Sequence, residues 1–144
     1  EGVHVLIDYA HSPDAIERVL AAVRANLPGR VIGILGCGGD RDPGKRPLMG
    51  AALAQGCDIA IFTSDNPRSE SASAIIEQMG PKRFTNVTVE IERKVAIERA
   101  LELAIKGDVV LILGKGHETG QEINGTIHPF DDREIAQELI GKRK

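Results

Sequence analysis

The 144-residue sequence has few aromatic residues, few cysteines and no long apolar run. It contains three phenylalanines, one tyrosine and no tryptophan, and none of its apolar stretches approaches the roughly 18 residues that can span a membrane. Basic residues are not in excess, because 18 lysines and arginines stand against 21 acidic residues, for a formal net charge of −3. We therefore expect neither a membrane nor a nucleic acid among the partners of this chain.

The two cysteines, Cys37 and Cys57, have no Cys-x-x-Cys spacing and no clustered histidines beside them. This argues against a zinc site or a disulfide framework, so we predict two reduced thiols and no metal site. The sequence begins directly with an apolar run, without a basic segment or a small-residue cleavage site. We expect no secretory signal, a cytoplasmic location and a segment cut from a longer chain.

Apolar runs alternate with amphipathic segments along most of the chain. Strands are predicted at 3–7, 31–35, 59–62, 87–91 (near an edge) and 109–113, and helices at 12–27, 48–53, 71–79, 95–105 and 131–140. This alternation predicts an α/β fold, doubly wound and Rossmann-like, with a mostly parallel sheet and helices on both faces. Asn124-Gly125 adds a small antiparallel hairpin near 121–128. With no repeat or linker, we expect a single domain over 1–144.

Polar and glycine-rich segments directly follow four of the predicted strands. They occupy 8–11, 36–42, 64–68 and 114–118. In an open parallel sheet, ligands bind outside the carboxyl ends of the strands, so these loops predict one site at a shared rim. A solvated turn is the alternative interpretation for any single loop.

One of these loops imitates a nucleotide-binding motif. Gly39, Gly44 and Lys45 have the spacing of a P-loop. However, Arg46 stands where a P-loop needs Ser or Thr to bind magnesium, and Pro43 removes one backbone N–H from the phosphate cradle. We therefore reject an autonomous nucleotide site here.

Charged side chains in the predicted loops suit an amino acid. Arg41 and Arg68 could each hold a carboxylate through two parallel hydrogen bonds. Glu118, after the flexible Gly114-Lys115-Gly116, could neutralise a ligand ammonium. Two arginines for carboxylates and one acid for an amine together predict a binding site for an amino acid. A ligand with a second charged end, such as a diamino acid, would suit this set of side chains. The alternatives are surface salt bridges for the arginines and an exposed carboxylate for Glu118.

The motifs DYAHSPDA at 8–15, GCGGDRDPGKRP at 36–47, SDNPR at 64–68 and GKGHE at 114–118 resemble the C-terminal domain of the Mur ligases. The resemblance covers nearly the whole chain in the family's order. It implies an ATP-dependent ligase that adds the third residue of the peptidoglycan stem peptide through an acyl phosphate, releasing ADP and phosphate. In that family, DNPR accompanies meso-diaminopimelate as the acceptor, whereas lysine-adding relatives depart from its arginine.

By matching positions, the resemblance implies a meso-diaminopimelate pocket formed by Arg41, Asp65, Asn66, Pro67, Arg68, Gly114 and Glu118. Asp8 and His11 would contact ATP when this domain closes onto the central one, although His11 could equally brace its loop. The P-loop, the magnesium sites and the domain that binds the UDP-linked muramoyl dipeptide have no counterpart in this sequence. ATP and Mg²⁺ would therefore belong to the full-length enzyme, with the central and N-terminal domains as partners and no catalytic residue in this domain alone.

Two other interpretations stay open. A folylpolyglutamate- or cyanophycin-type ligase shares an opening loop like that at 8–11, but those proteins lack the combination of DNPR and GKGHE. The chain could also be a stand-alone amino-acid-binding or regulatory module with no ligase attached.

Overall fold

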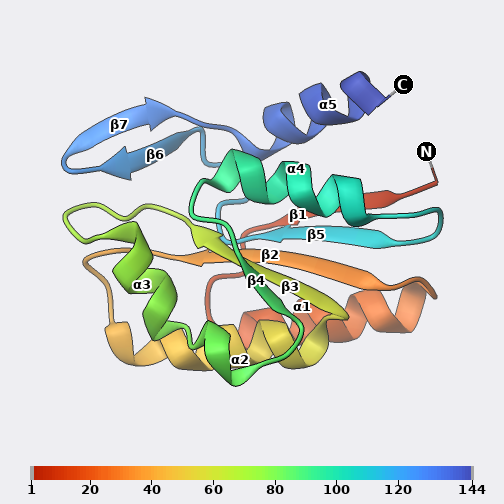
Figure 1. Ribbon diagram of the computed structural model, residues 1–144, viewed down its shortest axis with the longest axis horizontal. Helices are drawn as coiled ribbons and strands as arrows, with labels where there is room; N and C mark the ends of the chain where they lie inside the picture. Colours follow the sequence, from red (N-terminus) through yellow and green to blue (C-terminus); the bar gives the residue numbers. More distant parts are fainter. Residues whose placement is uncertain (1, 144) are drawn as a thin grey trace.

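A five-stranded parallel sheet forms the centre of the molecule (Figure 1). The computed structural model describes residues 2–143. The strands are β1 (His4–Asp8), β2 (Val31–Cys37), β3 (Ile59–Ser64), β4 (Val87–Val89) and β5 (Val109–Leu113), in the order β1-β5-β2-β3-β4. Because β5 returns between β1 and β2, the strand order reverses in the middle of the sheet. The predicted parallel sheet and the edge position of β4 are confirmed.

Helices cover both faces of the sheet, as the sequence predicts. On one face lie α1 (Pro13–Asn26), α2 (Arg46–Gly56) and α3 (Ala72–Gln78), and on the other α4 (Arg93–Leu103) and α5 (Asp132–Arg143) (Figure 1). The central strands β2, β3 and β5 alternate their side chains between the two cores, so nearly every residue in them is buried. This two-sided burial explains their continuous apolar runs.

Two of the helices, α1 and α3, begin after serines that cap them. Ser12 accepts a hydrogen bond from the Ala15 amide at 3.2 Å, and Pro13 follows at the first position of α1. Ser71 caps α3 in the same way. The predicted boundaries differ by a few residues at other ends: α4 begins at Arg93 rather than Val95. The sequence did not indicate this start, because an arginine is usually exposed and Arg93 is buried only by contacts in the folded chain.

The last third of the chain forms the predicted hairpin. Its strands β6 (Gly120–Ile123) and β7 (Thr126–Pro129) pair antiparallel around Asn124 and Gly125, both with positive φ. The hairpin projects beyond the carboxyl edge of the sheet (Figure 1). Two short 3₁₀ helices, η1 (Pro43–Lys45) and η2 (Pro81–Arg83), were not predicted. None of the helices within residues 2–143 has the length and apolarity that a membrane crossing requires.

Candidate functional site

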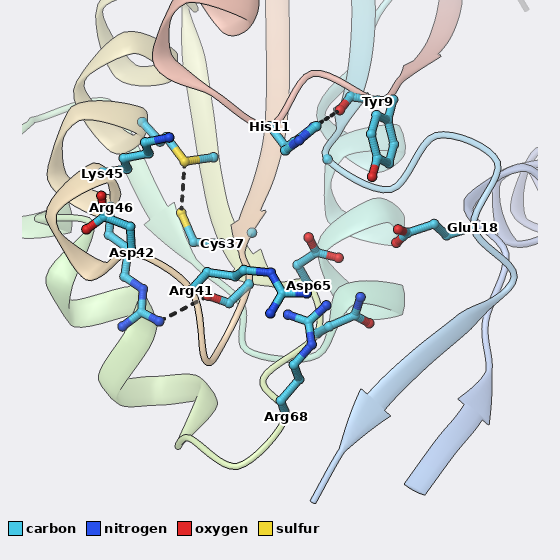
Figure 2. Close-up of a pocket in the computed structure, with 15 residues that line it drawn as sticks. Tyr9, His11, Cys37, Arg41, Asp42, Lys45, Arg46, Asp65, Arg68 and Glu118 are labelled. Carbon is cyan, nitrogen blue, oxygen red and sulfur yellow. Dashed lines mark hydrogen bonds between the residues drawn. The ribbon is translucent and has the colours of Figure 1, made fainter. Parts of the chain in front are cut away.

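A cleft of about 390 Å³ lies at the carboxyl edge of the sheet, where the four polar loops meet. All strands of the central sheet are parallel, so the segments after β1, β2, β3 and β5 leave it at one edge. The prediction of a shared rim is confirmed. The cleft is lined by Tyr9, His11, Gly36, Cys37, Gly38, Arg41, Asp42, Lys45, Arg46, Met49, Asp65, Asn66, Arg68, Gly114 and Glu118 (Figure 2).

Two of the residues predicted for the site do not line this cleft. The Asp8 carboxylate accepts a hydrogen bond from the Ala10 amide at 2.9 Å and so shapes its own turn. Pro67 lies behind the loop, where its backbone packs so closely against Gly39 that a Cβ at that glycine would overlap the Pro67 carbonyl. The remaining predicted residues are brought together, and what each of them binds stays a prediction.

Arg68 has a left-handed backbone conformation, with φ of 54°. Such a φ is uncommon for a residue with a Cβ and persists only where surrounding contacts hold the backbone in place. The Arg68 amide donates to the Glu122 carbonyl at 2.9 Å, and the Asn124 amide donates to the Arg68 carbonyl at 2.7 Å. Its guanidinium donates to the Gly39 carbonyl at 2.8 Å, and its Nε lies 3.4 Å from Glu122 Oε1. The arginine is thus fixed at one wall of the cleft.

Arg41 and Arg68 flank the same glycine. A Cβ at Gly38 would lie 2.9 Å from Arg68 Nη1 and 3.5 Å from Arg41 Cγ. Figure 2 shows the two guanidinium groups pointing toward each other near the Asp65 carboxylate. The Arg41 side chain makes a hydrogen bond with the carbonyl of its neighbour Asp40 and is exposed. Two cations that converge in this way form a group that could bind an anion, and that role stays a prediction.

Lys115, between the cleft residues Gly114 and Glu118 in the sequence, is a fully buried ammonium. It donates hydrogen bonds to Asn66 Oδ1 at 2.9 Å and to the Gly120 carbonyl at 2.7 Å. Its Nζ also lies 3.2 Å from Asp65 Oδ1 and 3.6 Å from Glu118 Oε1. A buried ammonium needs such partners, because desolvation strongly disfavours an isolated charge. Lys115 therefore ties the segments after β3 and β5 together and offsets the charge of both carboxylates.

Arg46 joins the glycine-rich loop to the segment after Arg68. It is almost completely buried and donates to both oxygens of Glu70, at 3.0 and 2.8 Å, to Gln78 and to the Gly38 carbonyl. The Asp40 amide also donates to Glu70. The hydrogen bonds from Arg46, and next that from the Asp40 amide, lower the pKa of Glu70 from 4.5 to about 2. Arg46, which stands where a P-loop would have Ser or Thr, therefore holds two loops together through its hydrogen bonds.

The loop after β1 presents an aromatic pair to the cleft. The rings of Tyr9 and His11 stack edge to face with centroids 4.5 Å apart. His11 Nδ1 lies 2.8 Å from the Tyr9 carbonyl oxygen, a geometry in which Nδ1 is the donor. The histidine therefore braces its loop and also lines the cleft. Tyr9 was not predicted as a site residue. Its position between Asp8 and His11 in the DYAH motif was the one feature of the sequence that could have indicated it.

Cys37 lies at the floor of the cleft and is a free thiol, as is Cys57. Burial raises the pKa of each from 9.0 to about 12, so both thiols are protonated near neutral pH. Within residues 2–143, no group of three or more histidine, cysteine or acidic side chains is arranged to hold a metal ion.

A second buried ion pair supports the edge of the sheet from the other face. Arg93 Nε and Nη2 donate to the two carboxylate oxygens of Asp132 at 2.8 and 2.7 Å, and neither side chain is exposed. The same guanidinium donates to the carbonyls of Ser64 and Leu113, the last residues of β3 and β5. Arg93 therefore fixes the points at which two of the cleft loops begin.

Residues 1–116 match the family described as Mur ligase, glutamate ligase domain. The chain belongs to the Mur ligase family. It is 48% identical over 145 residues to UDP-N-acetylmuramoyl-L-alanyl-D-glutamate--2,6-diaminopimelate ligase from Clostridioides difficile, in an alignment that covers 99% of this chain and 30% of the relative. A solved structure of a ligase with the same name superposes with a TM-score of 0.94 at 40% identity, covering 99% of this chain and 30% of that one.

This Mur ligase chain spans about 30% of the length of the curated relatives that it matches. A more distant likeness is that to a Mycobacterium tuberculosis folylpolyglutamate synthase complexed with ADP and AMPPCP. It has a TM-score of 0.61 at 24% identity and covers 76% of this chain and 26% of that protein. At this identity the likeness shows a shared fold alone.

Among the described residues of this Mur ligase domain, three buried cations were not predicted, namely Arg46, Lys115 and Arg93. Two of them stand inside motifs that the sequence analysis singled out, GKR and GKGHE. Their position inside these motifs was the one indication in the sequence that Arg46 and Lys115 support the site. Arg93 lies in an ordinary helical pattern and had no such indication. Its role depends on Asp132, a residue far along the chain that no local spacing connects to it.

Proposed function

We propose that this chain is the acceptor-binding domain of a ligase that adds meso-diaminopimelate to UDP-N-acetylmuramoyl-L-alanyl-D-glutamate. The convergence of Arg41 and Arg68 on one cleft carries the proposal, because meso-diaminopimelate has two carboxylates and lysine has only one. The name of the 48% identical relative agrees with this acceptor. We propose that Arg68 holds the carboxylate that lysine lacks.

The acidic side of the cleft suits the amino groups of the same ligand. Glu118 faces the cleft with about 40% of its side chain exposed, and Asp65 lies near the two arginines. The Lys115 ammonium lies near both carboxylates, at 3.2 Å from Asp65 Oδ1 and 3.6 Å from Glu118 Oε1. We propose that Glu118 accepts hydrogen bonds from a ligand ammonium and that Asn66 and Gly114 line the pocket around it. Pro67, which is not part of the lining, would shape the loop that carries Asn66 and Arg68.

We propose that the chain is one domain of a longer, cytoplasmic enzyme. Solved relatives of this fold contain ADP, and ATP, when bound, supplies the energy for forming the amide bond. Tyr9 and His11 would contribute the rim that meets the nucleotide, with Asp8 shaping that rim through its bond to Ala10. In this proposal the Mg²⁺ ligands, the phosphate-binding loop and the site for the UDP-linked dipeptide come from the central and N-terminal domains.

The experiment is an amide-forming assay with the full-length protein that contains this chain. We expect ATP- and Mg²⁺-dependent joining of meso-diaminopimelate to the UDP-linked dipeptide, with release of ADP and little use of lysine. The 144-residue chain alone, assayed in parallel, should neither hydrolyse ATP nor form product.

Other outcomes would point to the alternatives. Preference for lysine would overturn the role of Arg68, and glutamate addition to a folate would indicate the folylpolyglutamate-type activity. Turnover by the isolated chain would restore Gly39, Gly44 and Lys45 as a phosphate-binding loop. Binding of an amino acid by a full-length protein that forms no amide would indicate a stand-alone binding module.

A further inference from the structure

Strand β6 of the hairpin runs along the loop that contains Arg68 and contacts it residue by residue. Gln121 Nε2 donates to Ser64 Oγ at 2.9 Å and to the Asp65 carbonyl at 2.7 Å. The Glu122 amide donates to Asn66 Oδ1 at 3.0 Å. The loop is therefore held along its length by a strand that is not part of the central sheet.

The same strand fixes the unusual backbone of Arg68. The arginine forms an isolated parallel β-bridge with Ile123, made by the hydrogen bonds to the Glu122 carbonyl and from the Asn124 amide. The Glu122 carboxylate pairs with the guanidinium at 3.4 Å. A residue with a Cβ keeps a φ of 54° only where surrounding contacts hold it there. Without β6, we expect the backbone of Arg68 to relax and its side chain to leave the cleft.

We propose that β6 sets the acceptor selectivity of this site, with Gln121 and Glu122 as positioning residues for Arg68. This inference rests on the proposed function, in which Arg68 holds the second carboxylate of the acceptor. Neither positioning residue lines the cleft, so they act through the loop and not by touching the ligand.

Gln121→Met in the full-length protein tests the proposal, because methionine keeps the length of the side chain and removes both donated hydrogen bonds. We expect the KM for meso-diaminopimelate to rise about tenfold, with kcat changed less than about twofold. The KM for ATP should stay constant. The preference for meso-diaminopimelate over lysine should shrink by a similar factor, because only the first acceptor uses Arg68.

Glu122→Ala provides a second variant, which removes the ion pair with Arg68 and leaves the backbone contacts in place. It should also raise the KM for meso-diaminopimelate selectively. Ile127→Thr on the facing strand is the matched control, since that side chain is 71% exposed and lies on β7, outside the contacts with the loop. Its kinetics should match those of the unaltered protein. Thermal unfolding of each variant checks that the fold is retained.

The outcomes separate this inference from the proposed function. If the unaltered protein does not use meso-diaminopimelate, the proposed function fails. If it does, but Gln121→Met and Glu122→Ala keep both the KM and the preference over lysine, β6 does not set selectivity. A fall in kcat that is equal for both acceptors, with an unchanged preference, would reduce β6 to a purely structural role and would also overturn the inference.

Discussion

The carboxylate of Asp132 accepts two hydrogen bonds from the guanidinium of Arg93, at 2.8 and 2.7 Å, in a pair that is wholly buried. The same arginine donates to the carbonyls of Ser64 and Leu113 at the ends of two central strands. This pair connects the last helix to the edge of the sheet at which the cleft opens. Stability and site geometry therefore depend on one contact between residues distant in the sequence.

Removing one member of this pair should be costly. Asp132→Ala leaves the Arg93 guanidinium buried without its counterion, so we expect the free energy of unfolding to fall by about 3–5 kcal/mol. Urea denaturation of the 144-residue chain measures it. Glu138→Ala is the control on the same helix, because Glu138 pairs with Lys94 at 3.7 Å in half-exposed surroundings; it should cost less than about 1 kcal/mol. Equal losses for the two variants would contradict this account.

The low pKa of Glu70 makes the stability depend on pH in acid. Its pKa is about 2 in the folded protein against an ordinary value of 4.5. Between these values the unfolded chain binds more protons, so the contribution of Glu70 is present above about pH 4.5 and is lost as the pH falls toward 2. Urea midpoints across this range should fall less steeply for Glu70→Gln than for the unaltered chain. Parallel curves would show that the contact with Arg46 does not lower this pKa.

The buried thiols should be unreactive in the folded protein. At pH 8, a pKa of about 12 in place of 9.0 leaves roughly a thousandfold less thiolate, which is the reactive form. A disulfide reagent should therefore label Cys37 and Cys57 readily in urea and slowly under native conditions. Because only the unfolded chain loses these protons between pH 9 and 12, stability should also decrease across that range. Rapid native labelling of Cys37 would show that the cleft floor is open.

Much of the fold could be predicted from the sequence because its signals are local. Continuous apolar runs mark strands buried on both faces, Ser12 and Ser71 cap helices, and Asn124-Gly125 marks the hairpin turn. The parallel arrangement then places the four polar loops at one edge without further information.

The supporting contacts of the site could not be predicted in this way. The hydrogen bonds of Lys115 and the bridge between Arg68 and β6 join segments that meet only in the folded chain. Nothing in the composition distinguishes a buried lysine from the usual exposed one, and the left-handed φ of Arg68 is not expected of an arginine. The sequence showed which groups could bind a ligand, whereas the structure shows what holds them in place.

The central claim is that Arg68 chooses the acceptor, and the most direct test compares kcat/KM for meso-diaminopimelate and lysine in the full-length protein. Arg68→Ala should lower kcat/KM for meso-diaminopimelate by roughly 30-fold or more, because a partly desolvated, charge-assisted contact is lost. Arg68→Lys should restore little, since an ammonium cannot make the planar two-point contact. Arg18→Ala, on the exposed surface of α1, is the control and should change neither value. The account predicts that the preference for meso-diaminopimelate over lysine collapses in Arg68→Ala; an unchanged preference would contradict it and make Arg41 the next candidate.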